Sequence, residues 1–328
     1  MKRIALIGEC MIELNGAPFG AMEQAYGGDS LNTAVYLART AGQSVAIDYI
    51  SALGCDAISN GMITRWNDEG INTDMVLRDD TRQPGLYLIQ LDDQGERTFL
   101  YWRNQSAARY MMQHPDFEVV IKHLETVDMV YLSGISLAIL PAADRLRLIE
   151  LLTQLNHQGI AVVFDSNYRP ALWESADIAR GCYTQLLAIT DLALVTNDDE
   201  AALWGDDSEE VTLARLKAVG VKKAVVKMGP KGNYYEDFTT ETRTFVATTP
   251  VKTVIDTTSA GDSFNAGFLA GVLTGKTPIQ CSEQGHQLAG IVIQHKGAII
   301  PASATAAIDF NFSQNNINDN KIEKEAQS

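Results

Sequence analysis

The chain has 328 residues, of which 46% are hydrophobic and 20% are charged, and 26 basic against 41 acidic residues give a formal net charge of −15. This composition is typical of a globular protein with a sizeable core, and the acidic balance argues against nucleic acid or an anionic membrane surface as a partner. No stretch approaches the roughly 20 apolar residues of a membrane helix. The four cysteines are widely spaced, without a C-x-x-C pair, so neither a zinc site nor a disulfide framework is predicted.

The N-terminal segment MKRIALIGE predicts a buried first strand. Its apolar run, residues 4–7, is too short for the core of a signal peptide, so we expect a cytoplasmic location. After Gly8 the chain continues with ECM rather than with the second glycine of a G-x-G-x-x-G fingerprint. The sequence therefore argues against a dinucleotide-dependent oxidoreductase.

Two segments lack a helical period and predict a small β lid. Residues 72–103 contain YLIQLDDQGERTFLYW, which predicts a hairpin that turns at residues 92–95. Alternation along its second strand places Tyr101 and Arg103 on the same face. Residues 10–19 predict a further short extended piece. Such a lid would exclude water from a site beneath it, and its exposed edge could pair with a second copy of the chain.

Strand segments alternate with amphipathic helices from residue 127 onwards. Residues 127–135, 159–167, 192–197 and 223–229 predict buried strands, and leucines recur at helical spacing between them. This alternation predicts an α/β fold with a doubly wound, mostly parallel sheet flanked by helices. Arg169 follows the end of one strand, where the sites of such folds open.

The segment DTTSAGDSFNAGF, residues 256–268, predicts a helix that begins with small residues. Ser259, Ala260 and Gly261 would lie at its N-terminus, where backbone N–H groups lack helical partners and the dipole is positive. Small side chains let a phosphate approach these donors, and Asp262 would lie in the first turn beside it. An ordinary helix cap is the alternative, because Ser and Asp are favoured there in any case.

The string DTTSAGDSFNAG resembles the C-terminal signature of the ribokinase-like sugar kinases, the phosphofructokinase-B family, and GGDSLNTAVYLARTAG (residues 27–42) resembles their N-terminal diglycine signature. The resemblance extends along nearly the whole chain. It implies a ribokinase-like kinase domain over residues 1–311, which includes the lid predicted above at about 10–19 and 72–103. The tail over 312–328 is polar and low in aromatic residues, which predicts disorder. One position differs from the commonest form, because Ser259 stands where a glycine is usual.

The resemblance also implies the cofactors ATP and Mg²⁺ and a role for each matching residue. Asp262 would be the general base, with the N–H groups of Ala260 and Gly261 stabilising the transferring phosphoryl group. Asn197 and Glu200 match an N-x-x-E motif that would face Mg²⁺, mainly through water. Sugar hydroxyls would be held by Gly28, Asp29 and Asn32. The residues implied for ATP are Asn167, Arg169, Asn197, Lys227, Gly229, Gly232, Ser259, Ala260, Gly261 and His286. A capped surface helix, a glycine hairpin at 227–233 and a surface histidine are the alternatives at these sites.

Two tyrosines and two arginines point to the substrate. Tyr87, Tyr101 and Arg103 lie on the hairpin, and together with Arg169 they predict a pocket for a carboxylate-bearing sugar, since a guanidinium binds a carboxylate bidentately. GGDSLN, YWR and FDSNYRPALW are together similar to the branch of the family that phosphorylates 2-keto-3-deoxygluconate. A solvated hairpin charge at Arg103 and a structural ion pair at Arg169 are the alternatives. A kinase of a neutral sugar, as ribokinase and fructokinase are, and a non-catalytic sugar-binding regulator remain open as other functions.

Overall fold

The structure is a computed structural model that describes residues 1–17, 19–91 and 97–306. The hairpin turn predicted at residues 92–95 and the tail predicted over 312–328 lie outside the described residues.

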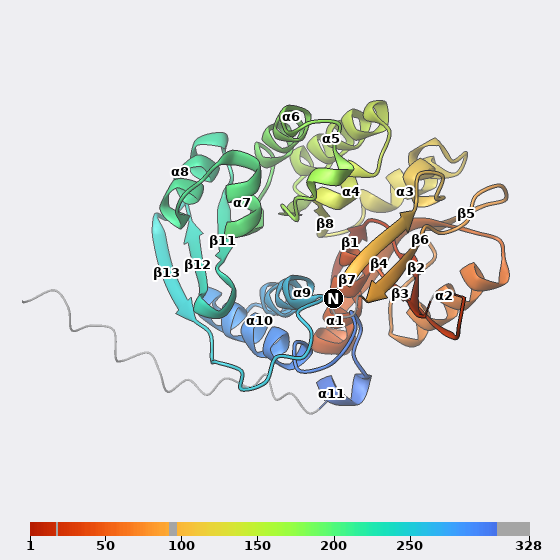
Figure 1. The fold of residues 1–328 in the computed structure, drawn as a ribbon. Coiled ribbons are helices and arrows are strands. Elements are labelled where there is room, and N and C mark those ends of the chain that lie inside the picture. The colour runs from red at the N-terminus through yellow and green to blue at the C-terminus, as the bar shows by residue number, and fades with distance from the viewer. Residues whose placement is uncertain (18, 92–96, 307–328) are drawn as a thin grey trace, which may run out of the picture.

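Within this part of the chain, a nine-stranded sheet forms the centre of the molecule (Figure 1). Its strands, in spatial order, are β13 (Thr242–Ala247), β12 (Gly232–Asp237), β11 (Lys223–Lys227), β10 (Leu192–Thr196), β9 (Ala161–Asp165), β8 (Met129–Ser133), β1 (Lys2–Ile7), β4 (Val45–Gly54) and β5 (Val76–Asp79). Neighbours from β11 to β5 pair in parallel, whereas β12 and β13 add in antiparallel fashion. The predicted mostly parallel sheet is thus confirmed. Its central strands are apolar on both faces because helices cover both.

Two groups of helices cover the two faces of this sheet (Figure 1). One face carries α1 (Asp29–Ala41), α2 (Ala57–Asp68), α9 (Ala260–Leu273) and α10 (Pro278–Val292). The other carries α3 (Phe117–Leu124), α5 (Ala142–His157), α6 (Ala176–Leu187), α7 (Asn197–Trp204) and α8 (Glu209–Val219). Two five-residue helices, α4 (Gly134–Ala138) and α11 (Ala302–Ala306), complete the helices of the described ranges, apart from short 3-10 turns. None of these helices combines the length and the apolar character needed to cross a bilayer.

A separate four-stranded sheet forms the predicted lid. Its strands, in order, are β3 (Met22–Gly27), β2 (Met11–Gly16), β6 (Leu86–Leu91) and β7 (Arg97–Trp102). The sequence did not predict β3, and the predicted lid range 72–103 includes β5, which instead pairs with β4 in the large sheet. The lid thus begins its second hairpin only at Leu86.

Helices α9 and α10 approach each other at the level of the backbone. A Cβ atom on Gly267 would lie 2.8 Å from the carbonyl oxygen of Gln284, and one on Gly285 would lie 2.8 Å from the Phe264 ring. Only glycine fits such an approach. This contact, together with the stacked rings of Phe264 and Phe268, fixes α9 so that its N-terminus opens at the carboxyl edge of the sheet.

Candidate active site

A cavity of about 1050 Å³ opens between the lid and the carboxyl ends of the parallel strands. The strand ends contribute Asp165, Thr196 and Lys227, and the inner face of the lid contributes aromatic rings. Most of the predicted site residues line this one cavity: Gly28, Asp29, Asn32, Tyr87, Tyr101, Asn167, Arg169, Lys227, Gly229, Gly232, Ser259, Ala260, Gly261, Asp262 and His286. The sequence therefore predicted a set of residues that the fold brings together from seven separate segments.

Three predicted residues do not line the cavity. The Arg103 guanidinium instead donates to the carboxylate of Glu9, whose side chain is fully buried. Glu200 is buried and accepts a hydrogen bond from Arg215; burial raises its pKa to about 7, although Arg215 opposes the shift. Asn197 is the first residue of α7 and is partly buried. Neither Asn197 nor Glu200 lines the cavity, and their predicted role beside a metal stays a prediction.

The cavity also contains acidic residues that the sequence did not single out. Asp198 and Asp199 of α7 and Asp165 at the end of β9 line the cavity. Asp165 lies near the end of the strand predicted over residues 159–167, so its position at the sheet edge was a usable signal. The segment 248–251 also lines the cavity, and no periodicity in the sequence marks it.

The N-terminus of α9 faces the cavity beside a lysine. Ala260 donates its N–H to the carbonyl oxygen of Thr257 at 3.2 Å, whereas in the described part of the chain the N–H of Gly261 has no protein acceptor. A Cβ on Gly261 would lie only 3.8 Å from Nζ of Lys227. An open N–H group, the helix dipole and an ammonium group therefore converge, and this combination binds phosphate.

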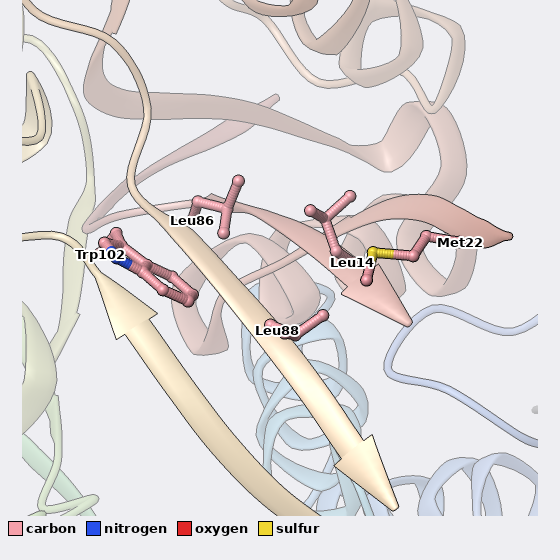
Figure 2. A pocket seen from close by; sticks show the side chains of 5 residues that line it. All are labelled: Leu14, Met22, Leu86, Leu88 and Trp102. Atoms are coloured by element: carbon pink, nitrogen blue, oxygen red, sulfur yellow. The ribbon is translucent and has the colours of Figure 1, made fainter. Parts of the chain in front are cut away.

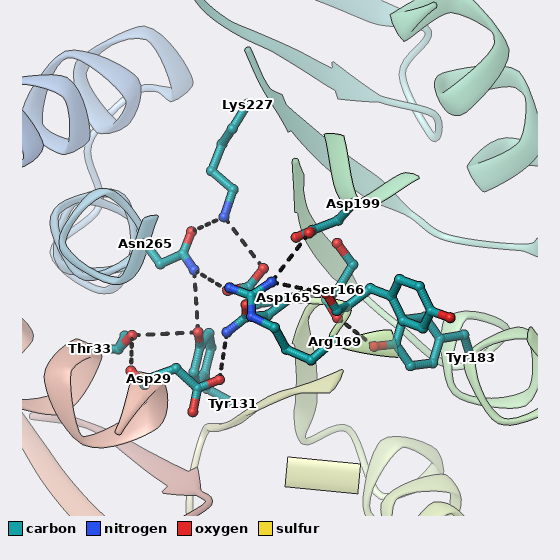
Figure 3. Close-up of polar contacts among 12 residues, drawn as sticks. Asp29, Thr33, Tyr131, Asp165, Ser166, Arg169, Tyr183, Asp199, Lys227 and Asn265 are labelled. Atoms are coloured by element: carbon teal, nitrogen blue, oxygen red, sulfur yellow. Dashed lines mark hydrogen bonds and ion pairs between the residues drawn. The ribbon is translucent and has the colours of Figure 1, made fainter. Parts of the chain in front are cut away.

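Lys227 is held in place by a buried hydrogen-bond network (Figure 3). Its Nζ lies 3.0 Å from Oδ1 of Asn265 and 3.4 Å from Oδ1 of Asp165. The Asn265 amide in turn donates to Oδ2 of Asp165 at 2.9 Å and to the Tyr131 hydroxyl at 3.3 Å. These contacts direct the amino group of Lys227 toward α9.

Asp262 is a carboxylate whose surroundings favour the protonated form. Burial and the negative charges of Asp29 and Asp165 raise its pKa to about 7. Hydrogen bonds from the Asn32 amide, at 2.9 Å, and from the Ser259 hydroxyl, at 3.0 Å, oppose this shift. A carboxylate with such a pKa can accept a proton near neutral pH and release it again.

Arg169 and Asp199 lie at the same edge of the sheet, on the other side of Asp165 from Asn265 (Figure 3). The half-exposed guanidinium of Arg169 is 3.4 Å from Oδ1 of Asp199. Burial and the charge of Asp165 raise the pKa of Asp199 to about 6, while Arg169 and Lys227 lower it. This long, partly solvated ion pair leaves most donors of Arg169 available to a ligand.

His286 lies at the far end of the cavity from the lid. Its ring is 5.0 Å from that of Phe264, and Nε2 is 3.3 Å from the carbonyl oxygen of Val246. Burial lowers the pKa of His286, so the ring is neutral at pH 7. A neutral ring beside a phenylalanine is a suitable surface for an aromatic base.

Comparisons with known proteins agree with this geometry. Residues 1–305 match the pfkB family of carbohydrate kinases. The 2-dehydro-3-deoxygluconokinase of Haemophilus influenzae is 56% identical over 313 residues, which cover 95% of this chain and 100% of the relative. The PfkB protein of Polaromonas sp. JS666 superposes with a TM-score of 0.80 at 24% identity, over 94% of this chain and 99% of that one. Aminoimidazole riboside kinase of Salmonella enterica, complexed with aminoimidazole riboside and an ATP analogue, superposes with a TM-score of 0.76 at 19% identity, over 93% and 96%. The predicted ribokinase-like fold is confirmed.

Ser259, which replaces the usual glycine, has a left-handed backbone with φ 65° and ψ 13°. A side chain in this region costs about 1 kcal/mol or more. We therefore expect Ser259→Gly to be more stable than Ser259→Ala by about 1 kcal/mol in urea unfolding. Both variants lose the hydroxyl that contacts Asp262, so the difference isolates the backbone. Equal stabilities would contradict the left-handed assignment.

Proposed function

The chain belongs to the pfkB family of carbohydrate kinases, and on this premise we propose that it transfers the γ-phosphoryl group of ATP to the primary hydroxyl of 2-keto-3-deoxygluconate, giving 2-keto-3-deoxy-6-phosphogluconate. The observation that carries the proposal is the 56% identity to a 2-dehydro-3-deoxygluconokinase over 95% of the chain. The cavity supports it with a carboxylate, an open helix N-terminus and a lysine at one point, which are the parts that phosphoryl transfer requires.

The sugar lies under the lid in this proposal. Asp29 and Asn32 accept and donate hydrogen bonds to its hydroxyl groups, and Tyr87 and Tyr101 cover it from the lid. Gly28 acts through the backbone, because a Cβ there would lie 2.1 Å from the carbonyl oxygen of Glu9. The primary hydroxyl faces Asp262, which accepts its proton as the oxygen attacks the γ-phosphorus.

ATP occupies the other half of the cavity. Its base lies near His286 and its phosphates extend past Gly229 and Gly232 toward the N-terminus of α9. The N–H of Gly261 and the ammonium group of Lys227 stabilise the charge on the transferring group. The lid excludes water, which suppresses hydrolysis of ATP.

Mg²⁺ would bind on the acidic side of the ATP half of the cavity. Among the described residues no group of three or more histidine, cysteine or acidic side chains is placed to hold a metal ion alone. Asp198 and Asp199 offer the hard oxygen atoms that Mg²⁺ prefers, and Mg²⁺ retains several waters and binds chiefly to phosphates. When bound, it would neutralise charge on the phosphates of ATP.

The substrate carboxylate is assigned to the arginines. Arg169 reaches the cavity directly. Arg103 is paired with Glu9, so its guanidinium group would donate hydrogen bonds to both Glu9 and the substrate.

A coupled assay of ADP release tests the reaction. Over a panel of 2-keto-3-deoxygluconate, ribose, fructose and a nucleoside, we expect turnover with the sugar acid to exceed that with the neutral sugars. Asp262→Asn should lower kcat by about 10²–10⁴-fold, because the general base is lost, while ATP binding measured by calorimetry is retained. Turnover of the variant near that of the wild type would refute the role of Asp262.

The pH profile gives a second readout of the same residue. Since the pKa of Asp262 is raised to about 7, kcat/KM should rise with pH up to about 7 and then level off. Besides burial, Asp29 and Asp165 are the charges that raise this pKa. Asp29→Asn should therefore move the midpoint to lower pH. A flat profile from pH 5 to 8 would count against Asp262 as the base.

Substitution of Arg169 tests recognition of the carboxylate. Because a hydrogen bond to a charged group contributes about 1.5–3 kcal/mol, Arg169→Ala should raise KM for the sugar acid by roughly 10–100-fold. The rise in KM for the sugar acid should exceed any rise in KM for ATP, for which Arg169 is also a predicted contact. Arg103→Ala should also lower the melting temperature, since it leaves Glu9 buried without its partner. An unchanged sugar KM in both variants would favour a neutral-sugar kinase.

A second copy of the chain is the proposed partner of the lid. Leu14, Met22, Leu86, Leu88 and Trp102 line an apolar groove of about 330 Å³ on the lid (Figure 2). The groove lies on the face opposite the cavity, because neighbouring residues such as Tyr87 and Tyr101 face the cavity. Trp102 is 59% exposed, and an apolar face of this kind on a sheet with open edges suits pairing with a like surface.

Light scattering after gel filtration measures this association. We expect the wild type to have twice the mass of the 35.8 kDa chain and Trp102→Lys to have the mass of one chain. Val211→Lys, at a surface position on α8 away from the lid, is the matched control. A monomeric wild type at micromolar concentration would refute the proposal.

A further inference from the structure

Asn167 joins the two halves of the cavity by one hydrogen bond. It follows β9, lines the cavity and is 8% exposed. Its side-chain amide donates to Oδ2 of Asp29, the first residue of α1, at 2.8 Å. The residue thus connects a strand end beside the proposed nucleotide half to the helix that carries the proposed sugar contacts.

The backbone of Asn167 is left-handed, with φ 29°. Few residues other than glycine take up this region, although asparagine does so more readily than most. The neighbouring side chains of this loop serve other elements, since Asp165 contacts Asn265 and Arg169 contacts Asp199. If the strand continued, the side chains of residues 165, 167 and 169 would point to the same face of the sheet. The left-handed backbone of Asn167 ends this alternation.

Asp29 lies on the same helix as a residue that contacts Asp262, the proposed general base. That residue is Asn32, one helical turn further along, and its amide donates to Asp262. Burial raises the pKa of Asp29, and hydrogen bonds from Ser133 and Asn167 oppose the shift. A partly buried carboxylate needs such donors, and without them it turns toward water or becomes protonated.

We propose that Asn167 is a positioning residue, whose amide holds the Asp29 carboxylate in the orientation that binds the sugar. The inference rests on the proposed function, because it takes Asp29 as a sugar contact. Strain at Asn167 is tolerated because a right-handed residue there would direct the amide away from α1. Direct contact of Asn167 with the nucleotide alone is the competing explanation.

Asn167→Ala separates these explanations through the two Michaelis constants. If the amide acts through Asp29, KM for the sugar at saturating MgATP should rise about tenfold, as for a lost hydrogen bond to a charged group. KM for ATP should change less than about threefold, well below that loss. A rise in KM for ATP with an unchanged KM for the sugar would overturn the inference.

A double-mutant cycle makes the dependence on Asp29 explicit. In an Asp29→Ala background, Asn167→Ala should change the sugar KM by less than about twofold, because the group that it positions is gone. An equal effect in both backgrounds would show that Asn167 acts independently of Asp29, and the inference would fall.

Asn167→Gly is the matched control for backbone strain. Glycine adopts positive φ freely, so this variant removes the amide without the strain that alanine retains. It should have the same raised sugar KM as Asn167→Ala but a higher melting temperature. A wild-type sugar KM in Asn167→Gly would mean that the amide is not needed.

Unfolding without substrate keeps this test separate from the test of function. The same cycle, measured by urea denaturation of the ligand-free proteins, should show non-additive effects of Asp29→Ala and Asn167→Ala, and additive effects would refute the contact. If the wild type turned over another sugar of the panel, the proposed substrate would be wrong. The KM comparison would then be made with that sugar and would still decide the role of Asn167.

Discussion

Mutual repulsion among carboxylates is the constraint around which this site is built. Asp29, Asp165 and Asp262 come from different elements and meet at one edge of the sheet. Burial and the charge of Asp165 raise the pKa of Asp29, and burial and the charges of Asp29 and Asp165 raise the pKa of Asp262. Each accepts a hydrogen bond from an asparagine on another element: Asn167, Asn265 and Asn32, respectively. An amide satisfies a carboxylate without neutralising it, whereas an arginine at the same place would lower its pKa and weaken it as a base. The carboxylates therefore keep their negative charge and favour cations beside them, and Lys227 is one such cation.

The fold meets this demand through its topology. Parallel strands end at a common edge, and the chain leaves β1 for neighbours on both sides, β4 and β8. Ligands of open α/β sheets bind at such a switch point. The helices α1 and α9 both begin there, so two positive helix ends face the acidic cluster. The stabilisation from these helix ends and amides allows three acids to share one cavity.

Much of this site could be predicted from the sequence, because strand ends and helix starts are local signals. Two groups of predicted site residues lie outside the cavity for clear physical reasons. Glu200 lies on the buried face of α7 and Asn197, one turn earlier, is partly buried, while Asp198 and Asp199 line the cavity. Arg103 was placed by strand alternation, but β7 ends at Trp102 and alternation stops with it. β3 was missed because MEQAYG is an exposed edge strand without alternating apolar residues. The three asparagine–aspartate pairs span up to 230 residues, and no local pattern reveals them.

The close backbone contact between α9 and α10 has a consequence for redesign. With glycines at the contact, neither helix can accept a larger side chain there, so Asp262 and the N-terminus of α9 are held in fixed positions. The lid, by contrast, presents replaceable side chains, such as Phe99 and Tyr101, to the cavity. A search for variants with altered sugar preference would therefore be most productive in libraries confined to the inner face of the lid, with α9 and its glycines left untouched.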